Sequence, residues 1–85
     1  MAKTIRSSGQ EALRQALIDA RKSAELTQAE LASKLKCQQS LVARLESGQR
    51  RIDVVEMIVL ARALGRDASD LLSIVENATD KNHTL

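Results

Sequence analysis

Apolar residues recur at helical spacing in five separate stretches of this chain. Within each stretch they lie three or four residues apart, which places them on one side of an α-helix. The pattern predicts helices over about residues 8–24, 27–35, 38–47, 53–64 and 68–75. No apolar run approaches the roughly 20 residues that span a bilayer. The pattern therefore indicates a small all-α domain.

Start and stop signals lie at the ends of these stretches. A capping box pairs a small polar residue with an acidic residue three positions later, and each satisfies a backbone N–H of the other. Three pairs fit this spacing: Ser8 with Glu11, Thr27 with Glu30, and Asp53 with Glu56. Asp67 can cap the fifth helix, while Gly48 and Gly65 terminate the third and fourth.

The third helix is too short to be stable by its own propensity, so packing must hold it. Val42 and Leu45 are its inward positions. The opposite face lacks the alternating charges of an ordinary solvated helix, and carries Gln38, Gln39, Ser40, Ala43 and Arg44. A polar face on a short, externally held helix is the first candidate for function.

The stretch LTQAELASKLKCQQSLVARLESG, residues 26–48, resembles the Cro/C1-type helix-turn-helix. This is the family of phage repressors and xenobiotic-response-element regulators. The matching positions are Arg21, the LTQAELA run, Leu35, Gln39-Ser40, Val42, Leu45-Glu46 and Gly48, and the likeness extends over roughly residues 10–75. It implies a five-helix, lambda-repressor-like DNA-binding domain over residues 8–76, with a flexible arm at 1–7 and a flexible tail at 77–85.

Two positions depart from the family pattern. Lys36 stands in the turn between the two motif helices, where glycine is usual, and Glu25 stands where glycine is frequent in the preceding loop. If either residue is left-handed, the absence of glycine costs on the order of 1 kcal/mol.

The resemblance also implies which side chains contact DNA. Base contacts fall on Gln38, Gln39, Ser40 and Arg44, and phosphate contacts fall on Thr27, Gln28, Arg50 and Arg51. A Gln amide at position 39 can pair with adenine N6 and N7 in a bidentate manner. Gln38 either caps the helix or contacts a base or phosphate, and Arg44 reads guanine or holds a phosphate. Without the motif, these residues would be a solvated surface.

Arg21 and Glu46 match a family ion pair between the first helix and the recognition helix. We interpret the pair as partly buried and structural, because it would fix the recognition helix without contacting a base.

Charge is distributed unevenly along the chain. Residues 1–51 hold ten basic and five acidic side chains, whereas residues 52–85 hold three basic and six acidic ones. The net charge of +2 hides this difference. The basic half contains the motif, as a phosphate-binding surface requires, and the acidic half is expected to face away from DNA.

The fourth helix is apolar around most of its circumference. Val54, Ile58, Ala61 and Leu64 are assigned to the core in this interpretation. The excess predicts a homodimer interface made of Val55, Val59, Leu60, Leu71, Ile74 and Val75. Alternatively, the fifth helix alone covers the excess.

Other features narrow the function. Phe, Trp and Tyr are absent from the 85 residues, so the core is aliphatic. Cys37 suits a packed thiol in a reducing cytoplasm, and His83 has no companion ligands. Residues 1–10 do not form a secretory signal. We expect no enzymatic activity, no cofactor, no metal and no membrane association.

These features together favour a cytoplasmic transcriptional regulator, by default a repressor, that binds a double-stranded pseudo-palindromic operator as a dimer. Polymerase contact through an acidic patch would instead give activation. The alternative is an antitoxin whose main role is to sequester a toxin protein.

Overall fold

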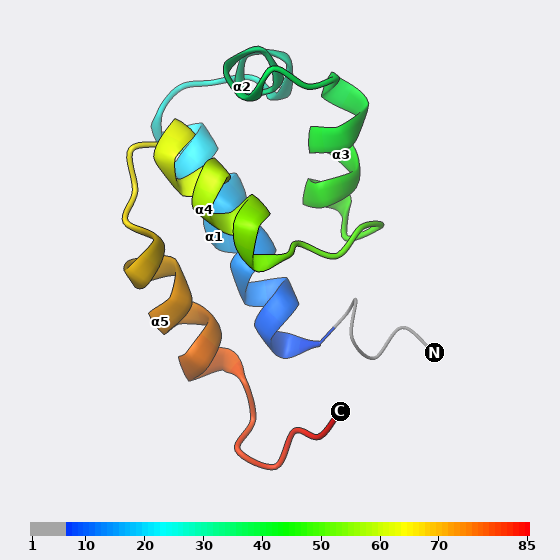
Figure 1. Ribbon diagram of the computed structural model, residues 1–85, viewed down its shortest axis with the longest axis vertical. Coiled ribbons are helices and arrows are strands. Elements are labelled where there is room, and N and C mark those ends of the chain that lie inside the picture. Colours follow the sequence, from blue (N-terminus) through cyan, green and yellow to red (C-terminus); the bar gives the residue numbers. More distant parts are fainter. Residues whose placement is uncertain (1–6) are drawn as a thin grey trace.

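The computed structural model describes residues 7–85, so all but the last residue of the predicted N-terminal arm lies outside the described residues. Five helices and no strand occur in this range, as the periodicity predicts (Figure 1). They are α1 (Ser8–Ser23), α2 (Gln28–Leu35), α3 (Gln39–Ser47), α4 (Val54–Ala63) and α5 (Ala68–Ala78). The fold is therefore all-α, with α2 and α3 forming the helix-turn-helix.

Two of the three predicted capping boxes are present, at Thr27 with Glu30 and at Asp53 with Glu56. The third prediction is wrong by one residue. Ser7, not Ser8, is the N-cap of α1, and its hydroxyl accepts the Gln10 N–H at 3.2 Å. Glu11, in the first turn of α1, forms an ion pair with Arg14.

Two non-glycine residues adopt the left-handed conformation, and they are the two departures from the family pattern. Glu25 has φ 59° and Lys36 has φ 57°, in the loops before and after α2. Gly48 and Gly65, with φ 80° and 68°, end α3 and α4 in the same conformation, where glycine adopts it without steric conflict. Both turns around α2 are therefore strained where glycine would not be.

An aliphatic core joins all five helices. Its buried members are Leu13, Leu17, Ala20, Leu31, Ala32, Val42, Leu45, Ile52, Met57, Leu60, Ala61, Leu64 and Leu71. Leu31 and Val42 are the most completely enclosed large side chains, so α2 and α3 are held through their apolar faces. Burial of each such side chain stabilises the fold by about 1.5–3 kcal/mol.

The phase of α4 differs from the prediction. Ala61 and Leu64 are buried as predicted. The rest of the core stripe is Met57 and Leu60, whereas Val54 is exposed and Ile58 only half-buried. Both stripes have helical spacing, and a helix that is apolar all round gives the sequence no means of choosing between them. The rotation of α4 about its own axis is therefore set by the helices that pack against it.

Helix α5 ends at Ala78 rather than near Val75 as predicted. Asp67 is its N-cap by backbone position, although its side chain makes no capping hydrogen bond. At the other end the Thr79 hydroxyl donates to the Val75 carbonyl at 2.7 Å. A Cβ on Gly9 would lie 2.6 Å from Thr79 Oγ1, so the close approach of α1 to the end of α5 depends on glycine.

Helices α3 and α5 lie on opposite sides of the molecule, with α1 and α4 between them (Figure 1). The acidic side chains of the chain's second half include Asp70 and Glu76 on α5. This arrangement separates the acidic helix from α3.

Candidate nucleic-acid interface

Helix α3 presents its polar face to solvent. Gln38, Gln39, Ser40 and Arg44 are all exposed, whereas Val42 and Leu45 on the opposite face are buried. Gln38 is the N-cap residue, but its side chain makes no capping hydrogen bond, so its amide is not used to stabilise the helix start. The predicted base-contacting residues are thus brought together on one accessible surface.

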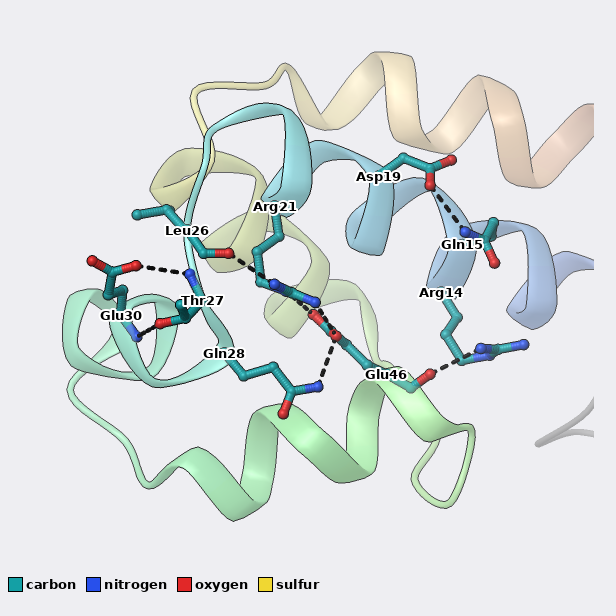
Figure 2. A network of polar contacts seen from close by, with 9 residues as sticks. All are labelled: Arg14, Gln15, Asp19, Arg21, Leu26, Thr27, Gln28, Glu30 and Glu46. Carbon is teal, nitrogen blue, oxygen red and sulfur yellow. Dashed lines mark hydrogen bonds and ion pairs between the residues drawn. The ribbon is translucent and has the colours of Figure 1, made fainter.

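Behind this face, Arg21 of α1 forms a bidentate ion pair with Glu46 near the end of α3. Arg21 Nε lies 2.6 Å from Glu46 Oε2, and Nη2 lies 2.9 Å from Oε1 (Figure 2). Both side chains are 11% exposed. The hydrogen bond to Glu46 raises the pKa of Arg21, although burial acts against it. This bidentate contact is the predicted ion pair, and it fixes the direction in which α3 points.

The same carboxylate also holds the start of α2. Gln28 Nε2 donates to Glu46 Oε1 at 3.0 Å, and Arg21 Nη1 donates to the Leu26 carbonyl at 2.8 Å (Figure 2). Because the Gln28 side chain is tied inward, what it offers a phosphate is its backbone N–H. Neither that N–H nor the Ala29 N–H has a hydrogen-bond partner within residues 7–85.

Thr27, also predicted to meet phosphate, is exposed at the N-cap of α2. Its Oγ1 accepts the Glu30 N–H at 3.0 Å, and its own N–H donates to Glu30 Oε1 at 2.8 Å. Hydrogen bonding of the Glu30 carboxylate to the Thr27 backbone N–H, and secondly to the Thr27 side chain, lowers the pKa of Glu30 below its ordinary value. The Thr27 hydroxyl hydrogen is still available to an anion, since the capping contact uses only the oxygen.

Sequence reasoning missed two further contacts from α1. Arg14 Nη1 donates to the Glu46 carbonyl at 2.8 Å. The Gln10 side chain forms two hydrogen bonds with the backbone of Ile52. Gln10 Nε2 donates to the Ile52 carbonyl at 3.1 Å, and Gln10 Oε1 accepts the Ile52 N–H at 3.0 Å. Gln10, Arg14 and Arg21 recur at spacings of four and seven, so they share one face of α1. That polar spacing was the available signal.

The two arginines after α3 differ in their surroundings. The Arg50 N–H donates to the Arg44 carbonyl at 3.3 Å, and Arg50 Nη1 lies 2.5 Å from Glu56 Oε2 on α4. Arg51 is exposed and makes no ion pair in the described part of the chain. Of these two arginines, only Arg51 is thus freely available to a phosphate.

The predicted dimer interface needs correction at two positions. Leu60 and Leu71 are 5% and 4% exposed and belong to the core, so neither is available to a second copy. Val75 is half-buried, while Val55, Val59 and Ile74 are exposed. Among the described residues, the structure also exposes three large apolar side chains outside the predicted interface, Val54, Leu72 and the C-terminal Leu85.

Cys37 is half-buried in the turn before α3. It lines an apolar groove of about 170 Å³ together with Leu41 of α3 and Val55 and Val59 of α4. No helix between residues 7 and 85 is long and apolar enough to cross a membrane. Over that same range, the structure has no group of three or more His, Cys, Asp or Glu side chains arranged to hold a metal ion.

Comparisons with known proteins agree on the fold. A helix-turn-helix family profile matches residues 17–71. An XRE-family like protein from Pseudomonas syringae pv. tomato str. DC3000 is 40% identical, with a TM-score of 0.80 over 93% of this chain and 96% of that chain. The clp gene regulator ClgR from C. glutamicum shares the fold at 24% identity, with a TM-score of 0.73 over 87% of this chain and 96% of that one. No curated protein sequence matches.

The family profile spans more than half of the chain, and the XRE-family like protein aligns with nearly all of it. The residues that both cover include the helix pair α2–α3 and the Arg21–Glu46 contact behind it. This chain therefore belongs to the Cro/C1-type helix-turn-helix family of DNA-binding transcriptional regulators.

Proposed function

We propose that this protein recognises a specific pseudo-palindromic operator as a homodimer and represses transcription by occupying it. The observation that carries the proposal is the two-sided character of α3. Gln39, Ser40 and Arg44 are exposed on one side, while Glu46 anchors the helix from behind through Arg21. A rigid helix with free polar side chains is what reading base edges in the major groove requires.

Gln39 is the first residue of α3, where recognition helices of this kind meet bases. Its amide both donates and accepts, so it matches the adenine edge, and each such bidentate pair gives about 1–3 kcal/mol of discrimination. Ser40 and Gln38 extend the polar surface, and Arg44 lies about one turn further on, within reach of guanine or a phosphate.

Phosphate contacts would flank this helix. The start of α2 offers the Thr27 hydroxyl and the N–H groups of Gln28 and Ala29, which favour an anion at a helix N-terminus. Arg50 and Arg51 follow α3 in the loop that leads to α4. These contacts would fix the position of α3 on the duplex without specifying sequence.

Assembly as a dimer is supported by the exposed apolar side chains of α4 and α5. Val54 and Leu72 line one groove, and Val55 and Val59 line another. Ile74 lies two residues beyond Leu72, about 200° around α5, so it does not share the face that Leu72 presents. A two-fold contact through α4 would cover its valines in both copies.

Val55→Glu tests this assembly, because an acidic residue in the first helical turn leaves the helix stable. Sedimentation should show a dimer for the wild type and a monomer for the variant. Ser73→Glu, on an exposed position of α5, is the matched control and should stay dimeric. A wild type that remains monomeric at high concentration would contradict the interface.

Selection of bound duplexes from a random pool tests the function as a whole. A related pair of half-sites should emerge, separated by about one helical turn or a multiple of it. Placing that site over a promoter should lower transcription from it. A pool that yields no preferred sequence would rule out operator recognition.

A further inference from the structure

The carboxylate of Glu56 faces the loop that follows the recognition helix. Its two oxygens have separate tasks: Oε1 accepts the Asp53 N–H at 3.0 Å, and Oε2 lies 2.5 Å from Arg50 Nη1. Glu56 also lines the groove formed with Leu41 and Leu45 of α3. A negative charge from the acidic half of the chain is therefore held beside the recognition helix, which lies in the basic half.

The Arg50 guanidinium is held by charge rather than by a well-aligned hydrogen bond. Nη1 is buried, yet among the described residues it has no hydrogen-bond partner. The Arg50 side chain as a whole is nevertheless 40% exposed, so it lies at the surface of the molecule. A phosphate would offer it hydrogen bonds that Glu56 does not. Arg50 is thus suited to exchange the Glu56 carboxylate for a phosphate of DNA.

From this arrangement we propose that Glu56 withholds Arg50 from the phosphate backbone and thereby lowers affinity for DNA of any sequence. The inference rests on the DNA binding proposed above. Non-specific affinity grows with each phosphate that a free cation neutralises, and an arginine already neutralised by a carboxylate contributes less. Arg51 supplies the unrestrained contact of the loop, and Arg50 is engaged only where the fit of α3 brings a phosphate close.

Glu56→Gln tests the proposal while keeping the helix start, since Gln also serves at this position of a capping box. Binding to an unrelated duplex should tighten by about 3- to 10-fold at low salt, and the salt slope should steepen by up to about 1. Glu76→Gln on α5 makes the same chemical change far from α3 and should have little effect.

Repeating Glu56→Gln in an Arg50→Ala variant tests whether the tighter binding depends on Arg50. There Glu56→Gln should no longer tighten binding, because no arginine remains to be released. Unchanged or weaker binding by Glu56→Gln in the wild-type background would overturn the proposal, as would equal tightening with and without Arg50. If the wild type binds no duplex at all, the proposed function itself fails, and that result is distinct from these outcomes.

Discussion

Helices α3 and α4 are neighbours of similar length that are fixed in different ways. Polar contacts orient α3: Arg21 holds the Glu46 carboxylate and Arg14 holds its carbonyl. The body of α4 is oriented mainly by apolar packing, through Met57, Leu60 and other core residues. Its polar contacts with other segments lie near its two ends, where Arg50 pairs with Glu56 and Lys34 Nζ donates to the Ala63 carbonyl at 3.4 Å. The sequence predicts the inward and outward faces of α3, whereas the predicted core stripe of α4 is correct at Ala61 and Leu64 and wrong at Val54 and Ile58.

The difference shows what each kind of contact specifies. Hydrogen bonds have direction, so a bidentate pair permits one orientation of the helix that carries it. Apolar burial is non-directional and scales with area, so an all-round apolar helix can satisfy it in several rotations. A helix that must present particular atoms to a ligand benefits from the first arrangement.

The strongest test of this comparison removes the polar anchor. Glu46→Ala leaves Arg21 and Gln28 without their partner in a largely buried place, so it should lower the free energy of unfolding by about 3 kcal/mol. Binding to specific and unrelated DNA should weaken together. Thermal unfolding and DNA titration measure the two effects. Adding Arg21→Ala should cost little more, because the unpaired charge is then gone.

The apolar anchor of α4 is tested next. Leu60→Ala creates a cavity in the core and should destabilise the fold by about 2–5 kcal/mol, whereas Val55→Ala on the exposed face should change stability by about 0.5 kcal/mol or less. Denaturant unfolding of both variants at equal concentration decides. Equal losses would mean that the rotation of α4 is not as described.

Recognition of the operator sequence should depend on Gln39, which takes part neither in the polar contacts that orient α3 nor in the core packing of α4. Gln39→Ala should reduce operator binding by about 1–3 kcal/mol and relax the preference at one base pair in each half-site. Stability should not fall, because Ala is the better helix former. Competition assays with single-base operator variants measure the change. A destabilised protein with intact preference would make Gln39 a packing residue.

The turns that flank α2 should yield a smaller gain. Lys36→Gly relieves a left-handed lysine and should stabilise the fold by up to about 1 kcal/mol, and Glu25→Gly should act similarly. The increase in melting temperature reports each effect. Gly65→Ala is the reverse control: its Cβ would meet no atom within 4 Å, so any loss is due to its positive φ alone.

The smallest effect is the pH dependence of stability that Glu30 gives in the first turn of α2. The pKa of Glu30 is lowered in the fold, so its contribution is present above the unfolded pKa and is lost as pH falls through the folded pKa. Glu30→Gln keeps the capping box without this titration. The wild type should be the slightly more stable protein at pH about 6, and the gap should close below about pH 4. Melting temperatures across this range measure it.

Local signals explain most of what the sequence predicts. The capping boxes at Thr27 and Asp53 need only residues three apart, and glycine missing from positions 25 and 36 points directly to strain. Contacts between distant residues were harder to foresee. The family pattern supplies Arg21 with Glu46, whereas the spacing of Gln10 and Arg14 places them on the same face as Arg21 without indicating which residues they bind. The pairing of Arg50 with Glu56 depends on where the loop returns to α4.

The contact of Arg14 with the Glu46 carbonyl has an electrostatic consequence for α3 as a whole. Aligned peptide dipoles give a helix a partial negative charge at its C-terminal end and a partial positive charge at its start. The guanidinium of Arg14 offsets the negative end, while the start at Gln38 has no side-chain cap to screen it. The partial positive end of the α3 dipole therefore lies beside Gln39 and Ser40, on the polar face of the helix.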